Sequence, residues 1–162
     1  AKCLSPALRI AYLVAPDTYS AARVGGAVRA VASMGSPLTA AIATRWIQDG
    51  TAVAVLGAIR SESHARLQIA ATAMSSLEIP INREGFHLWL PLPAHWSRAE
   101  FAARLRSVGI GVVGSDAFAL ESPPEAVRLG LGAPGTRDEL RSSLQSVVHL
   151  LGESPVAFST VV

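Results

Sequence analysis

Residues 126–140 read A-V-R-L-G-L-G-A-P-G-T-R-D-E-L, and they combine a short strand with the start of a helix. The run over residues 126–131 is apolar apart from one arginine, which predicts a strand. Thr136 and Glu139 have the spacing of a capping box, in which each residue satisfies a free backbone N–H of the other. The sequence therefore predicts a helix that begins here and runs to about Leu151.

The six residues from Gly130 to Gly135 also match the G-x-G-x-x-G pattern of dinucleotide-binding loops. That fold needs a second parallel strand after the helix, followed by an acidic residue about 20 residues on. Here Glu153 has no predicted strand before it, and Pro134 puts a rigid ring within the loop. We interpret the segment as the end of a strand followed by a capped helix, and not as a nucleotide site.

The residues before this stretch continue the alternation of strands and capped helices. Residues 85–93, G-F-H-L-W-L-P-L-P, are typical of a strand. Ser97 and Glu100 form a second capping box, which opens a helix to about Val108. Residues 109–114, G-I-G-V-V-G, predict a turn and a short strand. A strand-rich second half with helices on one face predicts an α+β fold with a small antiparallel or mixed sheet.

The first half is expected to be mostly helical. The apolar run over residues 9–15 predicts a buried strand, and Asp17 can cap a helix over residues 18–33. Ser36 and Pro37 have the residue types that start a helix, which should run to Gln48 and end at Asp49-Gly50. A long helix over residues 51–76 follows, with Glu62, Arg66 and other polar side chains on a solvated face and one apolar stripe.

The composition points to a protein that hides apolar surface against a partner. Half of the 162 residues are hydrophobic, 16% are charged and the mean hydropathy is +0.36. The longest stretch without a charged residue, residues 30–44, is shorter than the roughly 20 apolar residues of a membrane span. We therefore expect no membrane association, and instead a large buried interface with another chain or domain. The single cysteine, Cys3, fits a reducing, cytoplasmic compartment.

The net charge of +2 is too small to indicate nucleic-acid binding by this chain. We also expect no metal site, because none of the histidines is paired at the spacing of helix ligands or has a cysteine at zinc spacing. These histidines are His64, His87, His95 and His149. No G-x-S-x-G segment indicates a hydrolase nucleophile.

Lys2 is the one lysine among 14 basic residues, so it is the only side-chain amine for imine chemistry. It lies in residues 1–12, A-K-C-L-S-P-A-L-R-I-A-Y, which resemble the S-K-T-L-A-P-G-L-R-x-G-Y signature of fold-type I pyridoxal-phosphate proteins. The resemblance implies that Lys2 forms the internal aldimine with the cofactor and that Arg9 contacts its phosphate. The chain departs from the signature where the family's serine, threonine and two glycines are replaced, and these losses weaken hydrogen bonding to the phosphate. These departures are Ala1, Cys3, Ala7 and Ala11.

Later segments are similar to the MocR subgroup of GntR-type transcriptional regulators, which carry an aminotransferase-like domain. The similarity includes W-I-Q-D-G-T at 46–51, A-I-R-S-E-S-H-A-R at 58–66, the G-x-H-x-W strand at 85–89, G-I-G-V-V-G-S-D-A-F at 109–118 and the R-L strand at 126–131. Together with the lysine segment it covers nearly all of residues 1–151. It implies that Arg128 binds the α-carboxylate of a substrate or effector.

The resemblance also implies a domain organisation. Residues 1–50 would be the C-terminal remnant of the large pyridoxal-phosphate domain, and residues 51–162 the small C-terminal domain. The phosphate loop, the aromatic residue that stacks on the cofactor ring and the Asp that pairs with its nitrogen would precede Lys2, as would a DNA-binding winged helix. We therefore expect this chain alone to lack transaminase activity, stable cofactor binding and specific DNA binding. The unpaired edge of the predicted strand at 9–15 leads us to expect a homo-oligomer.

Three interpretations of the whole protein stay open. The first is a transcriptional regulator that senses pyridoxal phosphate or an amino-acid adduct, with this chain as its effector-sensing and oligomerisation part. The second is a working aminotransferase, in which Lys2 both binds the cofactor and carries protons. The third is a small domain that binds a protein partner through its apolar surface. A basic helix-turn-helix upstream would favour the first interpretation over the second.

Overall fold

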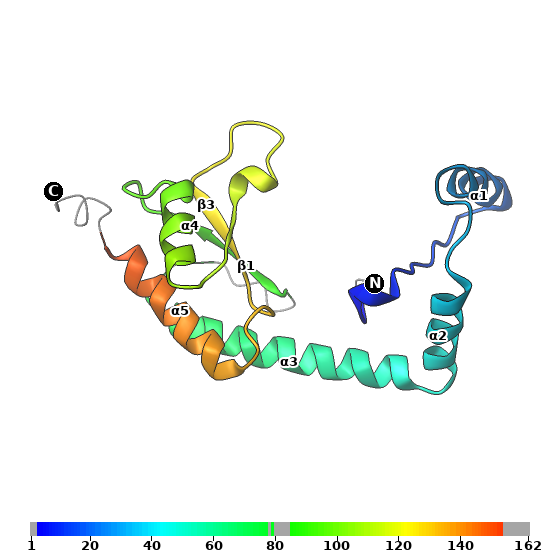
Figure 1. Ribbon diagram of the computed structural model, residues 1–162, viewed down its shortest axis with the longest axis horizontal. Helices are drawn as coiled ribbons and strands as arrows, with labels where there is room; N and C mark the ends of the chain where they lie inside the picture. The colour runs from blue at the N-terminus through cyan, green and yellow to red at the C-terminus, as the bar shows by residue number, and fades with distance from the viewer. Residues whose placement is uncertain (1–2, 78, 80–84, 154–162) are drawn as a thin grey trace. The chain divides into compact units, whose positions relative to one another are not determined.

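The computed structural model describes residues 3–77, 79 and 85–153, and the chain forms two compact units, residues 1–60 and residues 61–162. Helix α3 (Thr51–Ala73) runs through the boundary between them (Figure 1). The division predicted after residue 50 concerns the domains of a longer protein, and it stays a prediction.

The first unit is built from helices that begin where the sequence predicts. A short 3-10 helix η1 (Pro6–Leu8) precedes α1 (Thr18–Ala32) and α2 (Pro37–Gln48). The Asp17 carboxylate caps α1 by accepting a hydrogen bond of 2.7 Å from the backbone N–H of Ser20. Gly50, at φ +83°, makes the left-handed turn between α2 and α3, a conformation that glycine adopts without steric cost.

The buried strand predicted at residues 9–15 is wrong. These residues have no regular secondary structure, and the side chains of Leu13 and Val14 are 73% and 94% exposed. A strand needs a neighbour to satisfy its backbone N–H and C=O groups, and no other described residue of this unit is in a strand. The apolar pattern was therefore present without the pairing that would make it a strand.

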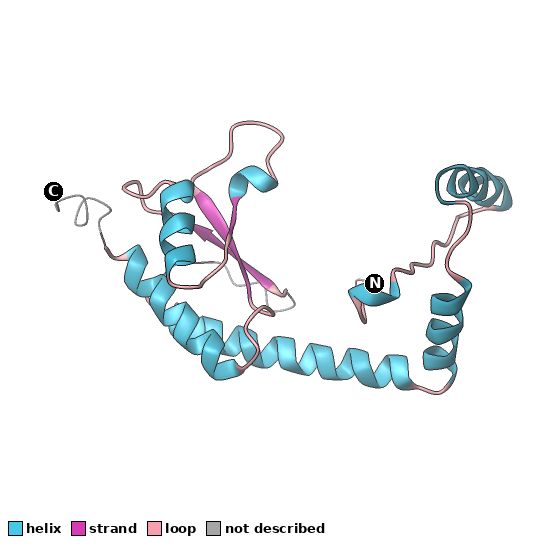
Figure 2. Cartoon of the chain, in the orientation of Figure 1, coloured by secondary structure: helices cyan, strands magenta, loops and turns pink. Residues whose placement is uncertain are grey.

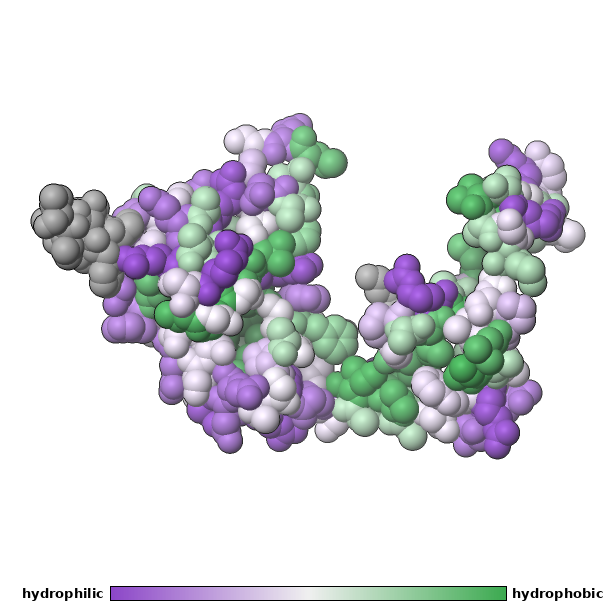
Figure 3. Space-filling model, viewed as in Figure 1, coloured by the Kyte–Doolittle hydropathy of each residue, from purple (hydrophilic) through white to green (hydrophobic). Residues whose placement is uncertain are grey.

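The first unit leaves most of its large hydrophobic residues in contact with solvent. Among its described residues only Leu8 and Ala43 are buried. Figure 3 shows hydrophobic surface over α2 and the first turns of α3. The exposed residues are Tyr12, Leu13, Val14, Tyr19, Val24, Val28, Val31, Met34, Leu38, Ile47 and Val53. This unit therefore lacks a core of its own.

The second unit is an α+β structure, as predicted (Figure 2). Its sheet contains β1 (His87–Pro91), β2 (Val113–Gly114) and β3 (Ala126–Gly130), in the order β1-β3-β2 with both pairs antiparallel. Helices α4 (Arg98–Ser107) and α5 (Arg137–Leu151) complete it together with the second half of α3. The short 3-10 helix η2 (Ser115–Ala117) directly follows β2.

The two faces of the sheet have different roles. Leu88 and Leu90 of β1 and Val127 and Leu129 of β3 share one face, and they are buried in the core against the helices. The core is completed by Leu67 and Ala70 of α3 and Met74 directly after it, Trp96, Phe101 and Leu105 at α4, and Leu131, Leu140, Leu144, Val147 and Leu151 at α5. The opposite face carries the alternate residues, among them Trp89 and Arg128.

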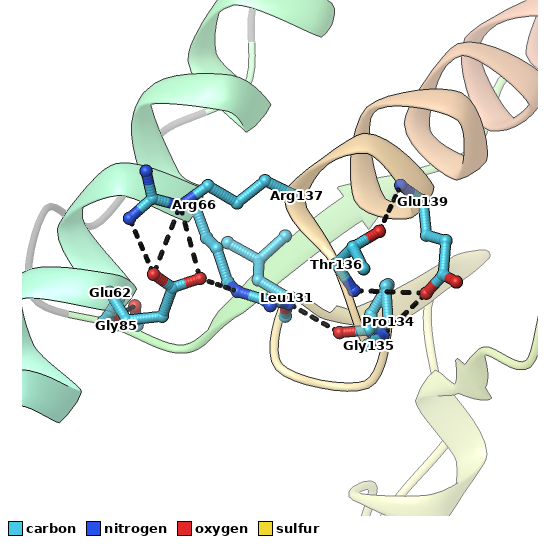
Figure 4. Close-up of polar contacts among 10 residues, drawn as sticks. Glu62, Arg66, Gly85, Leu131, Pro134, Gly135, Thr136, Arg137 and Glu139 are labelled. Carbon is cyan, nitrogen blue, oxygen red and sulfur yellow. Dashed lines mark hydrogen bonds and ion pairs between the residues drawn. The ribbon is translucent and has the colours of Figure 1, made fainter.

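Helices α4 and α5 begin at the capping residues predicted from the sequence. Ser97 accepts a hydrogen bond of 3.2 Å from the N–H of Glu100 at the start of α4. At α5 the full capping box forms between Thr136 and Glu139 (Figure 4). The segment 130–135 is thus the end of a strand and the approach to a capped helix, as the sequence analysis interpreted it.

Replacing Phe101 by alanine is expected to destabilise the second unit, because its ring is fully buried and packs edge-on against Trp96 at 5.4 Å. A truncation of this kind costs about 3–5 kcal/mol of unfolding free energy. Urea unfolding followed by circular dichroism measures it. Val108→Ala is the control, since Val108 ends the same helix and is 66% exposed. Equal effects of the two changes would contradict this description of the core.

Candidate functional site

Arg128 lies in the central strand of the sheet, on the face that points away from the core. In the register of β3 it stands opposite Trp89 of β1 and Val113 of β2. Its neighbours along the strand, Val127 and Leu129, point into the core and fix the strand in place. Arg128 itself is half-buried. The strand therefore holds this guanidinium at the middle of the open face.

An aromatic ring packs against the guanidinium. Its central carbon lies 4.6 Å from the centroid of the Phe118 ring. Phe118 in turn packs edge-on against Trp89, with the ring centroids 6.1 Å apart. The Nε atom of Arg128 is buried without a hydrogen-bond partner, and no acidic side chain in the described part of the chain forms an ion pair with it. The positive charge is held by packing and is not neutralised by an acid.

His87 shares this face, two residues before Trp89 on β1. Its side chain is exposed, yet partial desolvation by its neighbours and, second, the positive charge of Arg128 lower its pKa below the ordinary value of 6.5. The lowered pKa favours the neutral imidazole, and Arg128 supplies the positive charge on this face. A planar guanidinium in such a setting can bind a carboxylate through two parallel hydrogen bonds.

The loop that carries Phe118 is tied down at both ends. Arg98 of α4 pairs with Asp116 on one side of the loop, at 3.3 Å, and with Glu125 on the other, at 2.5 Å. The buried Ser115 hydroxyl donates to the carbonyl of Pro124 across the base of the loop. The Phe118 N–H donates to the Ser115 carbonyl at 3.0 Å. These bonds hold the backbone on both sides of Phe118.

The other predicted site residues belong to the first unit. Lys2 lies outside the described residues. Arg9 is exposed and directly follows η1, whose start is capped by the Ser5 hydroxyl. Arg9 has a φ of +45°, a left-handed conformation that is uncommon for residues other than glycine. The roles predicted for Lys2, Arg9 and Arg128 stay predictions.

A network of two arginines around one glutamate fixes the end of β3 (Figure 4). Arg66 of α3 is 11% exposed at its side chain and donates to the carbonyls of Leu131 at 2.9 Å and Pro134 at 2.8 Å. Arg66 also pairs with Glu62 at 2.7 Å, and Arg137 of α5 pairs with the same carboxylate at 2.7 Å. This network joins α3 to the β3–α5 loop, and so it supports the strand that carries Arg128.

The described ranges 3–77, 79 and 85–153 contain no group of three or more His, Cys, Asp and Glu side chains that could hold a metal ion. No helix within them is long and apolar enough to cross a membrane.

Comparison with known proteins identifies the fold. No family model matches the chain. The chain is 28% identical over 154 residues, or 94% of its length, to the uncharacterized HTH-type transcriptional regulator YdeF of Bacillus subtilis. Among solved structures it resembles LysN, the α-aminoadipate aminotransferase of Thermus thermophilus, which was solved with N-(5'-phosphopyridoxyl)-L-leucine. The TM-score is 0.80 at 20% identity, and the match covers 93% of this chain and 40% of LysN.

Two further aminotransferases give the same result. A kynurenine aminotransferase of Pyrococcus horikoshii matches with a TM-score of 0.73 at 15% identity, over 83% of this chain and 35% of that one. An aspartate aminotransferase of Rhodobacter sphaeroides matches with a TM-score of 0.66 at 16% identity, over 83% and 35%. The chain has the fold of the C-terminal part of a class I aminotransferase. It spans a third of the length of YdeF.

Within this aminotransferase-like fold, the residues that pack around Arg128 were not predicted from the sequence. Trp89 and Phe118 lie in segments that resemble the MocR subgroup, but no role followed from those segments. The cross-strand pairing of Trp89 with Arg128 and the loop between β2 and β3 bring the three side chains together. Arg66 was also missed, because Glu62 and Arg66 were interpreted as part of a solvated face. Their spacing of four residues was the available signal.

Acidification is expected to weaken the network around Glu62. Hydrogen bonds from Arg137 and then Arg66 lower the pKa of Glu62 from 4.5 to about 2. Because the folded-state pKa is depressed, the stabilisation is complete above pH 4.5 and is lost as the pH falls from there toward 2. The difference in unfolding free energy between the wild type and Glu62→Gln should therefore shrink between pH 6 and pH 3.

Urea unfolding across this pH range measures that difference. Glu121→Gln is the control, because Glu121 is exposed in the loop before β3 and should show little effect at any pH. A difference for Glu62→Gln that stayed constant with pH would contradict the role assigned to its ion pairs.

Proposed function

We propose that this chain is the C-terminal part of an aminotransferase-like, pyridoxal-phosphate-binding transcriptional regulator of the MocR subgroup, and that it senses an effector and contributes to oligomerisation. The observation that carries the proposal is Arg128, whose guanidinium forms no ion pair among the described residues and packs against the Phe118 ring on the open face of the sheet. The relation to an HTH-type regulator over 94% of the chain favours a regulator over an enzyme.

Arg128 is the residue that we propose binds the carboxylate of an amino-acid effector. A carboxylate that reaches the guanidinium gains charge-assisted hydrogen bonds, and it has no acidic side chain of the described residues to displace. The Phe118 ring covers one side of the guanidinium and reduces its contact with water there, which strengthens the electrostatic attraction. The effector is therefore a carboxylate-bearing amine or amino acid.

Two residues of this chain fit pyridoxal phosphate by their chemistry. Arg9 is an exposed guanidinium suited to a phosphate dianion, and Lys2 is the chain's only side-chain amine. When bound, the cofactor would supply an aldehyde that reacts with primary amines and a ring that withdraws electrons. By resemblance, the residues that stack on the ring and pair with its nitrogen precede Lys2. Stable binding is therefore proposed for the longer protein and not for this chain alone.

The apolar surface of the first unit supports a larger assembly. Residues such as Val14 and Val31 are 94% and 89% exposed, and they lie on elements without a core of their own. Burial of such surface is the main favourable term in association. We propose that the preceding domains of the same polypeptide and a second copy of the protein cover it. DNA would be bound only through a winged-helix domain outside this chain.

A working aminotransferase is the second candidate. Its support is that the matching solved structures named above are all aminotransferases. In that case Lys2 would bind the cofactor and move the proton, and Arg128 would bind the substrate carboxylate. A third candidate, a separate protein-interaction domain, is supported only by the exposed apolar residues of the first unit.

The mass of the native polypeptide separates these candidates. Intact mass measurement with N-terminal sequencing, on protein from its source cells, is expected to find a cofactor domain and a basic winged helix before Lys2. A cofactor domain without the winged helix would favour the aminotransferase. A native product of 162 residues would overturn both and leave the interaction domain.

Replacing Arg128 by glutamine is expected to remove selective carboxylate binding. Butyrate and butyramide are matched probes, because they differ mainly in the charged group. At constant ionic strength, the wild-type chain should bind butyrate better, and Arg128→Gln should lose at least about tenfold of that preference, since a charge-assisted pair is lost. Arg141→Gln on α5 is the control, because Arg141 is exposed and paired with Asp138. An unchanged preference in Arg128→Gln would refute the role.

A further inference from the structure

We infer that Phe118 is a positioning residue for Arg128. The face of its aromatic ring holds the guanidinium in place, a role that an acidic side chain usually has. The inference rests on the proposed carboxylate-binding role of Arg128. It assigns a role to the loop between β2 and β3, which neither strand pairing nor core packing explains.

Arg128 is held in an unusual way for an arginine. A long, charged side chain keeps a single orientation only if something fixes it, and the usual partner is a carboxylate. Here the guanidinium carbon lies 4.6 Å from the Phe118 ring centroid, within the range of a cation–π interaction. The Nε atom is buried yet makes no hydrogen bond to any described residue. Apolar and aromatic packing therefore replaces polar bonds on the inner side of this arginine.

An aromatic ring is a better partner than an acid for an arginine that binds a carboxylate ligand. A carboxylate partner would occupy the N–H donors and neutralise the charge that a ligand carboxylate needs. A ring face attracts the cation electrostatically but accepts none of its in-plane N–H groups. Phe118 can therefore orient Arg128 and leave those donors for the ligand. Trp89 packs edge-on against Phe118 at 6.1 Å and limits the movement of that ring.

The loop between β2 and β3 is held by bonds on both sides of Phe118. Phe118 is 47% exposed, so it is not there to fill the core. Nevertheless Arg98 pairs with Asp116 and Glu125 at the two ends of the loop, and the Ser115 hydroxyl bonds to the Pro124 carbonyl at 2.5 Å. Bonds of this kind reduce the freedom of the segment. Their effect is to keep one exposed ring over Arg128.

The test compares Phe118→Leu with Phe118→Tyr in the full 162-residue chain. Leucine keeps apolar bulk and removes the ring, whereas tyrosine keeps the ring. Leu120→Ala is the matched control, because Leu120 is in the same loop and fully exposed. Two quantities are measured by NMR: the upfield ring-current shift of the Arg128 side-chain protons, and the ratio of butyrate to butyramide affinity at constant ionic strength.

The wild type, Phe118→Tyr and Leu120→Ala are expected to keep both the upfield shift and the preference for butyrate. Phe118→Leu should lose the shift and weaken the preference about fivefold, the size expected for a cation–π contact. Unfolding midpoints of the variants report whether the fold is intact. A loss of the preference for butyrate in Leu120→Ala would mean that the loop affects carboxylate binding without the Phe118 ring, and it would contradict the inference.

The same measurements separate a failure of the positioning role of Phe118 from a failure of the carboxylate role of Arg128. If Phe118→Leu kept a preference that Arg128→Gln abolished, the positioning role would be wrong while the carboxylate role of Arg128 stood. An Arg128 signal without the upfield shift in the wild type would also overturn the positioning role. If the wild type showed no preference that depends on Arg128, the proposed carboxylate role itself would fail, and this inference with it.

Discussion

The antiparallel pairing of β3 with both of its neighbours is the constraint on which the second unit depends. Once β3 lies between β1 and β2, the alternation of side chains assigns Val127 and Leu129 to the core and Arg128 to the opposite face. A slip of one residue would bury the guanidinium and expose the leucine. The packing that stabilises the fold and the exposure of the candidate site are thus consequences of a single register.

Polar contacts then fix the connections that the strand pairing leaves free. Arg66 holds the two carbonyls of the β3–α5 loop, and Arg98 holds both ends of the loop that carries Phe118. Each of these arginines comes from a helix and reaches a segment far away in the sequence. They contribute to the site by limiting how far the open face of the sheet can rearrange, and they do so without contacting the position where a carboxylate would bind.

The two units differ in how well their sequence accounts for their structure. The caps at Asp17, Ser36 and Ser97 and the capping box at Thr136 were visible in the sequence, because each cap is a bond between residues only three positions apart. The strand expected at residues 9–15 failed for the opposite reason, since its existence depends on neighbours that the described part of its unit does not contain. Helices are local structures, whereas strands are not.

The sequence by itself determined the positions of the helices, the two long strands of the sheet and the α+β class, and its resemblance to a known family led to the prediction that Arg128 binds a carboxylate. Only the tertiary structure decided how Arg128 is held. Phe118 and Trp89 stand 10 and 39 residues before Arg128 in the chain, and no periodic pattern links them. They meet because strand register and the path of a loop bring them together, and both depend on contacts between residues that are distant in the sequence.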